Sequence, residues 1–483
     1  MGHVSRKPAL WYHAPALPSR NREAMTISMN STERRSVLAL ATVYGSRMLG
    51  LFMVLPVFVL LGRDLDGATP MLLGVALGAY GLTQAVLQIP FGMLSDRFGR
   101  KPLIYLGLVL FAAGSLVAAF SDSIHGVIAG RLLQGAGAIA SVLMALASDL
   151  TREENRTRAM AMIGLSIGLA FALSLVLGPL VGEWYGLTGI FSLTALFSVI
   201  GIVLVALVVP SPESRIHQPD ALPAREQIRQ VLSSSRLLRL DAGIFSLHLI
   251  LTAVFLVIPV LLEDRLSVPA SSHWWVYLTA MGTGFIAMLP LMIVGEKHRR
   301  IKGVMIFAVA LLAMAIGLLG MPLGSVLQLW LVLFGFFIGF NLLEALLPSL
   351  ISKEAPAAGK GSAMGVYSTS QFLGSFVGGS VGGWASGVAG LTGVIVLMLA
   401  AALVWLVIVA TMAQPSYASS LSLRLDPACS TAPPEIRETL LAVPGVKDAV
   451  VLVNAHEAWL KVDRQKLNEE ALWQLSFVVR QQA

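Results

Sequence analysis

The stretch Gly92-Met93-Leu94-Ser95-Asp96-Arg97-Phe98-Gly99-Arg100-Lys101-Pro102-Leu103-Ile104 lies between two long apolar runs. No charged residue precedes Asp96 in the run that starts at Thr69, and none follows Lys101 until Asp122. The polar groups of such a turn cannot be satisfied within the hydrocarbon of a bilayer. The stretch is therefore predicted to be the hairpin between two membrane helices, with its basic residues on the cytoplasmic side.

The composition of the whole chain agrees with this prediction. Of its 483 residues, 56% are hydrophobic and only 13% are charged, which a soluble protein rarely shows. We therefore expect an all-α membrane part with twelve transmembrane helices. The apolar runs of spanning length are 36–62, 70–92, 102–120, 125–149, 159–181, 187–209, 242–262, 273–294, 303–321, 325–350, 361–385 and 390–413.

The distribution of positive charge predicts the orientation. Lysine and arginine residues collect in alternate loops between the spans, whereas the remaining loops contain only Arg63 and Arg265. Both termini are therefore expected to be cytoplasmic, in a multi-pass protein of a bacterial-type inner (plasma) membrane. The same distribution explains the net charge of +7 without a nucleic-acid partner. The single cysteine, Cys429, permits no internal disulfide and no thiolate metal cluster.

The pattern G-x-L-S-D-R-x-G-R-K-P-L in the opening stretch resembles motif A of the major facilitator superfamily. The flanking segments Arg47–Pro56 and Tyr80–Phe91 are similar to a YajR-like subgroup of proton-driven drug exporters. The resemblance covers residues 35–413. It implies the fold of that family, with two pseudo-symmetric bundles of six helices, and a small additional domain at the carboxy terminus.

An internal repeat supports two related halves. Gly178-Pro-Leu-Val-Gly-Glu-Trp184 matches Gly378-Gly-Ser-Val-Gly-Gly-Trp384, a shift of 200 positions. The same shift aligns Glu296 with Asp96, Arg300 with Arg100, and Gly335 with Gly135, while Arg299 takes the position of Gly99. Repeats of this kind are typical of transporters with a binding site between the halves. Chance similarity between glycine-rich membrane helices is the alternative.

These observations divide the chain into five parts. The first is a disordered cytoplasmic amino terminus, and the third is a cytoplasmic linker. In the linker, Ile228, Val231, Leu232 and Leu238 form an apolar stripe that predicts a helix on the membrane surface, with a solvated linker as the alternative. The predicted parts are 1–34 (amino terminus), 35–210 (first bundle), 211–241 (linker), 242–413 (second bundle) and 414–483 (soluble cytoplasmic domain).

The composition after residue 413 is that of a soluble domain. Strands are predicted at 419–425, 447–453 and 458–462, and helices at 434–441 and after Asn468. The order βαββα resembles a ferredoxin-like fold without its final strand, as in the YAM domain of the YajR-like subgroup. Related folds hold metals through a C-x-x-C motif. This chain has no such motif, so no metal is expected.

Motif A is expected to act as a conformational switch, as the resemblance implies. Gly92 would allow close approach to helix 11, whose start lies near Gly361, and Asp96 would face the positive end of that helix. The family places a further acid at the end of helix 4, where this chain has Asp149. We expect an Asp96–Arg100–Asp149 relay, with a simple positive-inside anchor as the alternative. The full predicted set is Gly92, Asp96, Arg97, Gly99, Arg100, Lys101 and Asp149.

Charged residues within the predicted spans suggest a pathway for protons or substrate. Arg131 lies in a stretch that resembles motif B, with a structural ion pair or snorkelling as the alternative. Arg47 and Glu344 carry opposite charges on helices 1 and 10, which line the cavity in this family. They could bind substrate or carry protons, or form a fixed tether. The predicted pathway residues are Arg47, Arg131, Gln134, Glu344, Asn341, Tyr80, Gln84 and Gln371; His248 could also titrate but is more often structural in such a position.

A glycine-rich segment of helix 5 resembles motif C, which is associated with exporters. It is expected to bend helix 5 and let helices 5 and 8 pack closely, with ordinary helix packing as the alternative. A second glycine of the motif is replaced by Glu183. The predicted residues are Gly168, Gly178, Pro179 and Gly182.

No nucleophile–base pair, phosphate-binding loop or metal-ligand spacing is evident, so an enzyme is not expected. The first hypothesis is a secondary transporter that exports small amphiphilic compounds or drugs in exchange for protons, by alternating access. It would need no cofactor beyond the proton gradient. Its partners would be a small-molecule substrate, protons and the bilayer, and it would act as a monomer. The alternatives are a proton-coupled importer and a membrane sensor with a ligand-reading carboxy-terminal domain.

Overall fold

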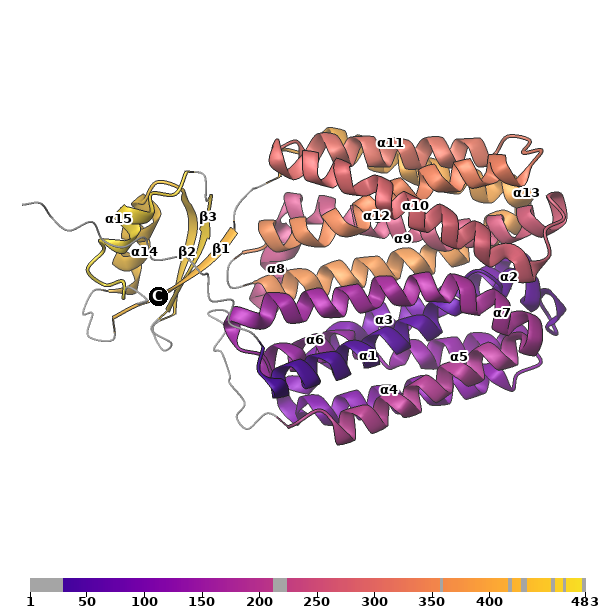
Figure 1. The fold of residues 1–483 in the computed structure, drawn as a ribbon, viewed down its shortest axis with the longest axis horizontal. Coiled ribbons are helices and arrows are strands. Elements are labelled where there is room, and N and C mark those ends of the chain that lie inside the picture. The colour runs from indigo at the N-terminus through magenta and orange to yellow at the C-terminus, as the bar shows by residue number, and fades with distance from the viewer. Residues whose placement is uncertain are drawn as a thin grey trace, which may run out of the picture.

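The computed structural model describes residues 29–211, 224–356, 359–415, 419–426, 432–452, 457–463 and 466–479. Figure 1 shows a bundle of long helices with a small α/β domain, here called the tail domain, at one end. We call that end of the bundle the tail side. The first half contains α1 Ser31–Met53, α2 Phe58–Leu61, α3 Pro70–Phe98, α4 Arg100–Ala119, α5 Ile124–Ala136, α6 Ala140–Asp149 and α7 Glu153–Leu207.

The second half begins after a short helix in the linker. Ten helices in the described part of the chain are long and apolar enough to cross a membrane. The elements of this half are α8 Ala224–Ser233, α9 Ser235–Val260, η2 Leu261–Arg265, α10 His273–Lys297, α11 Ile301–Leu319, α12 Val326–Glu354 and α13 Lys360–Ala410.

Two of these helices cross the membrane twice. α7 has 55 residues and α13 has 51, whereas a bilayer core of about 30 Å needs only about 20. Each is interrupted by one glycine with a left-handed backbone, Gly186 at φ 60° and Gly390 at φ 60°. The ten helices therefore provide twelve spans, and the predicted all-helical membrane fold is confirmed. The two glycines are 204 positions apart, four more than the shift of the internal repeat, so the turns correspond but are displaced by about one helical turn.

The first helix begins earlier than expected. Asn30 accepts a hydrogen bond from the Glu33 amide at 2.7 Å, and the Glu33 carboxylate accepts one from the Asn30 amide at 2.9 Å. This reciprocal capping stabilises the start of α1 at Ser31. The predicted disordered terminus, 1–34, therefore ends too late by four residues, and its positions 1–28 lie outside the described residues.

The two halves contact each other closely at the end far from the tail domain. Gly74 and Gly78 of α3 pack directly on the backbone of α13 at Gly379 and Phe376, so a side chain at either glycine would collide with it. An ion pair of 3.0 Å between Arg63 and Asp264 also joins the halves at this end. The ion pairs given for the described residues at the tail side, in contrast, lie within one half or between the second half and the tail domain.

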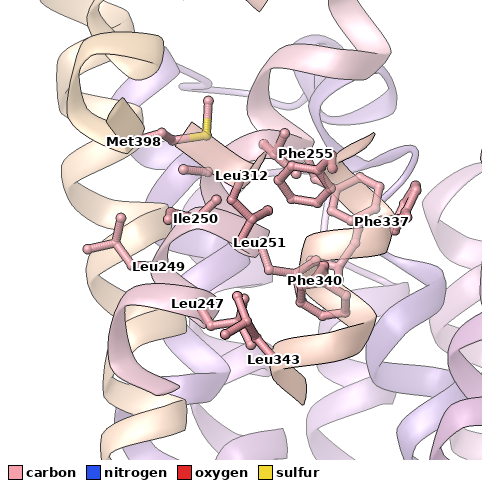
Figure 2. Close-up of a cluster of buried hydrophobic side chains, with 14 of the residues drawn as sticks. Leu247, Leu249, Ile250, Leu251, Phe255, Leu312, Phe337, Phe340, Leu343 and Met398 are labelled. Atoms are coloured by element: carbon pink, nitrogen blue, oxygen red, sulfur yellow. The ribbon is translucent and has the colours of Figure 1, made fainter. Parts of the chain in front are cut away.

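The core of the second half is almost entirely aliphatic and aromatic. Figure 2 shows side chains from α9, α11, α12 and α13 that meet in one cluster, including Leu251, Phe255, Leu312 and Phe340. Leu312 and Phe255 are 0% and 1% exposed. Packing of this density makes the interior of the second half rigid.

The linker helix α8 packs on the second half. Val231 is 1% exposed, and the Ser362 hydroxyl of α13 donates a hydrogen bond of 2.9 Å to the Gln227 side chain. Leu232 and Leu238 instead are 51% and 41% exposed. The predicted apolar stripe is thus divided: part of it enters the protein core, and only part remains outside. Residues 212–223 of the linker lie outside the described residues.

The tail domain has the predicted βαββα order, with the strands in the order β1-β3-β2, all pairs antiparallel. One addition differs from the prediction. Leu425 and Val478 form a short antiparallel bridge where a ferredoxin-like fold would have its fourth strand, so that strand is reduced rather than absent. The elements are β1 Ser419–Arg424, α14 Pro433–Ala442, β2 Val446–Leu452, β3 Glu457–Val462 and α15 Glu469–Trp473.

Candidate functional site

Arg100 joins the two acids of the motif A hairpin. Its guanidinium lies 2.5 Å from Asp96 Oδ1 and 3.1 Å from Asp149 Oδ2, and it donates a hydrogen bond of 2.6 Å to Ser95 Oγ. Gly99 makes this geometry possible, because its φ of 97° and ψ of 155° are accessible essentially only to glycine. The structure thus brings the three predicted relay residues together within the first half.

The neighbour expected for this hairpin is not the one observed. At Gly92, an added Cβ would meet Ser141 of α6 at 3.5 Å and no described atom of α13 within 4 Å. The Asp96 side chain is 60% exposed. The predicted contact of Gly92 and Asp96 with the start of helix 11 is therefore wrong for this conformation. The contact of α3 with α13 extends as far as Ala85 and Ile89, opposite Thr369 and Gly365, and is not continued at Gly92.

The other basic residues of motif A have separate roles in the structure. The Lys101 ammonium donates a hydrogen bond of 2.7 Å to the Val209 carbonyl, just after the end of α7. A cation at that position interacts favourably with the negative end of the helix. The Arg97 guanidinium lies 5.4 Å from the centre of the Phe98 ring. Neither residue belongs to the Asp96–Arg100–Asp149 cluster.

Arg47 is the centre of a buried polar cluster in the first half. It donates hydrogen bonds to the Tyr80 hydroxyl at 2.7 Å and to Gln84 Oε1 at 2.6 Å, and Gln84 donates to Gln88 at 2.6 Å. The Arg47 side chain is only 2% exposed, yet its Nε and Nη1 groups have no hydrogen-bond partner among the described residues. No carboxylate lies in this cluster, so the charge is stabilised by dipoles and by the rings of Tyr80 and Phe111.

Arg131 is used to connect two helices. Its guanidinium donates to the carbonyls of Ala76 and Leu77 on α3, each at 3.3 Å, and to Gln134 Oε1 at 3.0 Å. Gln134 donates in turn to Ser115 of α4 at 2.8 Å. The side chain of Arg131 is 1% exposed and has no acidic partner among the residues described. The ion pair considered from the sequence is therefore not observed.

The second half carries the acids at membrane depth. Glu344 Oε2 lies 4.0 Å from His248 Nδ1, beyond hydrogen-bond distance, and His248 Nε2 lies 2.8 Å from the Gln371 side-chain nitrogen. Asp241, two turns before His248 on α9, is 4% exposed, and neither of its oxygens has a hydrogen-bond partner in the described part of the chain. Tyr367 of α13 is also buried, and its hydroxyl has no hydrogen-bond partner among the described residues.

Sequence reasoning missed Asp241 and Tyr367. The predicted span began at residue 242, so Asp241 was assigned to the linker, whereas α9 begins at Ser235. The serine at 234, which caps α9, was the available signal.

Glu33 was missed in the same way. Its side chain is buried, with 3% of the residue exposed, and it accepts hydrogen bonds from Arg152 at 2.8 to 3.1 Å. The capping pattern Asn30-x-x-Glu33 predicts its position at the start of α1.

Arg47 and Glu344 do not form a tether in this structure. Arg47 is hydrogen-bonded within the first half, Glu344 lies beside His248 of the second half, and no ion pair of the described residues joins Arg47 to Glu344. Asn341 is also occupied, because its amide donates to the Met281 carbonyl of α10 at 3.5 Å. The arrangement therefore separates cations in the first half from acids in the second.

The glycines of motif C pack against the first two helices of their own half. Gly178 contacts the Met53 carbonyl at the end of α1, and Gly182 contacts Leu61 of α2. Pro179 lies within α7. Gly168 has no neighbour within 4 Å of an added Cβ among the described atoms. α7, which contains helix 5, does contact α10, which is helix 8, as predicted, but Gly178 and Gly182 face α1 and α2 instead. Close approach serves the contact between helices 5 and 1 of one half.

These features, together with sequence comparison, define the class of protein. Residues 40–379 and 242–475 match the Major Facilitator Superfamily, and the chain belongs to this family. It is 47% identical over 443 residues to the inner membrane transport protein YajR of Escherichia coli K12, a match that covers 91% of this chain and 96% of that protein. The chain is accordingly a multi-pass membrane transporter of the YajR-like type.

Two more distant relatives are informative. The multidrug resistance protein MdtH of Aeromonas salmonicida is 28% identical over 343 residues, which cover 70% of this chain and 84% of MdtH. The crystal structure of a point mutant of the nucleoside transporter NupG superimposes with a TM-score of 0.61 at 14% identity, over 79% of this chain and 99% of NupG. The second likeness concerns the fold alone.

Proposed function

We propose that this protein is a proton-coupled antiporter of the inner membrane that exports small amphiphilic compounds by alternating access. The observation that carries the proposal is the separation of charge at membrane depth. Arg47 and Arg131 of the first half have no acidic partner, and Asp241 of the second half has no hydrogen-bond donor, among the residues described. An uncompensated charge at this depth is costly, so it is usually retained for binding or proton transfer.

Asp241, Tyr367 and Glu344 form a route for protons under this proposal. The seven residues from Asp241 to His248 correspond to about 10 Å along α9, with Asp241 nearer the tail side. Glu344 lies beside His248, and its side chain is 39% exposed in spite of its position within α12. A proton taken up by Glu344 would neutralise the acid and alter the balance between the two conformations.

The proposal assigns the tail side to the cytoplasm. The positive-inside distribution of Arg and Lys predicts that both termini lie there. The close contact of the halves at the opposite end then supports an inward-facing state, which an exporter and an importer share. Motif A would act as the switch when the halves close. Export of drugs is suggested by the name of the MdtH relative.

Everted membrane vesicles test this function. Respiration acidifies their interior, so an antiporter accumulates a substrate dye such as ethidium, and dye entry partly dissipates the pH gradient. Expulsion of preloaded dye together with protons would support the importer instead. No coupled flux with any of a panel of amphiphilic cations would contradict the antiporter. The same assay on a variant without residues 414–483 tests the membrane sensor. Unchanged dye transport would show that the tail domain is only accessory to a transporter.

A further inference from the structure

A cavity of about 490 Å³ lies between the tail domain and the second half of the membrane part. Arg236 of α9 and Arg299 of the α10–α11 turn line its membrane side. Lys447, Asp463 and Lys466 line its other side and come from the tail domain. The cavity is therefore complete only while the tail domain is docked.

The docking that forms the cavity rests on two buried side chains of the tail domain. Lys461 is 6% exposed and donates hydrogen bonds to the carbonyls of Ser352 at 3.2 Å and Lys353 at 2.6 Å, in the last turn of α12. Asp463 is 3% exposed and accepts two hydrogen bonds from Arg299, at 2.7 and 3.2 Å. These contacts hold the two walls of the cavity at a defined separation.

The walls of the cavity carry an excess of positive charge. Four of the lining residues are Lys or Arg, and one is acidic. The acid, Asp463, is already bound to Arg299, and the Arg236 guanidinium lies 3.5 Å from Glu354. No acidic side chain of the described residues forms an ion pair with Lys447 or Lys466. An anion in the cavity would relieve the mutual repulsion of these cations.

We propose that this cavity binds a phosphate-bearing anion, which ties the tail domain to the second half of the transporter. Guanidinium groups offer paired donors to phosphate oxygens, and lysine ammonium groups act as point charges beside them. The volume exceeds that of a single phosphate and falls in the range of small-molecule sites. The anion could be a soluble phosphate compound or the headgroup of an anionic lipid, because the chemistry of recognition is the same.

Binding at this site would regulate the position of the tail domain. A ligand that binds only the docked form stabilises docking in proportion to its concentration. The cavity wall includes α9, which also carries Asp241 and His248, and the turn that leads into α11. The anion would therefore fix the tail side of helices that must move as a unit during transport. This inference does not depend on the direction of transport or on proton coupling.

Calorimetric titration of the full-length protein in detergent with inorganic pyrophosphate tests the site. We expect binding by the wild-type protein and at least a tenfold loss of affinity in Lys447→Gln/Lys466→Gln. The charge-retaining variant Lys447→Arg/Lys466→Arg should still bind. The matched control, Arg265→Gln/Arg424→Gln, removes two exposed cations outside the cavity and should bind as the wild type does. Absence of wild-type binding, equal affinity in the lysine variant, or an equal loss in the control would overturn the proposal.

Two further measurements separate folding from binding and identify the source of the anion. Pyrophosphate should slow proteolytic release of the wild-type tail domain at least threefold and leave the Lys447→Gln/Lys466→Gln variant unchanged; equal slowing in both would contradict the site. In nanodiscs, weaker pyrophosphate binding with phosphatidylglycerol than with phosphatidylcholine would support a lipid headgroup as the natural occupant. Equal binding in the two lipids would support a soluble phosphate compound.

Discussion

The Arg299 guanidinium lies 2.7 Å from the Asp463 carboxylate and joins the α10–α11 turn to the tail domain. Arg299 has a φ of 52°, a left-handed conformation that side chains other than glycine rarely adopt. The repeat aligns it with Gly99, which has a φ of 97° in the first half. The second half thus keeps a turn of the same hand but uses a residue whose side chain can bind the tail domain.

Removal of the acid in this pair should weaken docking. Asp463→Asn loses a charge-assisted pair of hydrogen bonds at a buried position and should destabilise the docked state by about 2 kcal/mol. Hydrogen exchange in the last turn of α12, which the docked domain covers, should rise in the variant. The control is Glu435→Gln, which neutralises an exposed acid of α14 in the same domain. Unchanged protection of this turn in Asp463→Asn would show that the ion pair does not hold the domain.

The backbone at Arg299 leads to a separate prediction. Arg299→Gly and Arg299→Ala both lose the ion pair, but only alanine retains the penalty of a positive φ. The glycine variant should therefore be more stable than the alanine variant by about 1 kcal/mol, which thermal unfolding of the purified protein can measure. At Arg300, where φ is −109°, the same two substitutions should show no such advantage for glycine. An alanine variant as stable as the glycine variant would contradict the strained turn.

Docking of the tail domain should become tighter as the pH rises above about 8. Burial, assisted by the Lys360 charge, lowers the pKa of Lys461 to about 8, although Glu354 and Asp448 oppose the shift. The docked form therefore binds fewer protons than the undocked form between pH 8 and the ordinary lysine pKa of about 10.4. Below pH 8, Lys461 is protonated in both the docked and the undocked form, so the full free-energy cost of burying its charge opposes docking.

The measurement for Lys461 is protection of the last turn of α12 from hydrogen exchange at pH 7.5 and pH 9.5, corrected for the intrinsic exchange rate. The wild-type protein should be better protected at the higher pH, whereas Lys461→Gln should lose the difference. A control variant, Lys302→Gln, should behave as the wild-type protein does. Protection of the wild-type protein that falls with pH would reverse the sign and exclude Lys461 as the cause.

The motif A cluster should be required for transport but not for folding. Asp96→Asn weakens one of the two ion pairs that hold Arg100, and we expect at least a tenfold fall in dye transport by vesicles with equal protein content. Because the Asp96 side chain is 60% exposed, its effect on stability should be small. Asp64→Asn, an exposed acid at the opposite end of the bundle, is the control. Normal transport by Asp96→Asn would remove the proposed switch.

Neutralisation of Glu344 should separate transport from the proton gradient. Glu344→Gln keeps the size of the side chain but cannot exchange a proton, so substrate exchange at equal pH should persist while uptake driven by a pH gradient is lost. Glu263→Gln, which neutralises an exposed acid of η2, should leave coupling intact. A normal response to the gradient in Glu344→Gln would assign the coupling to another group, and Asp241→Asn would then be the variant to measure.

Sequence patterns were enough to predict the number of spans, the motif A hairpin, the relation between the halves and the βαββα order of the tail domain. Each follows from properties that neighbouring residues decide: the length of an apolar run, the charges and glycines of a turn, or the alternation of a strand. The clustering of Asp96 and Arg100 is of the same kind, because four residues separate them on one chain segment.

Which surfaces meet could be learned only from the arrangement of the helices in space. Whether Gly92 touches α13 depends on how two rigid halves are rotated, and no local pattern records that angle. The burial of Asp241 depends on packing around α9, and the pairing of Arg299 with Asp463 joins residues 164 positions apart. Such contacts are set by the small free-energy difference between alternative packings of the same helices, which the sequence of any one helix does not contain.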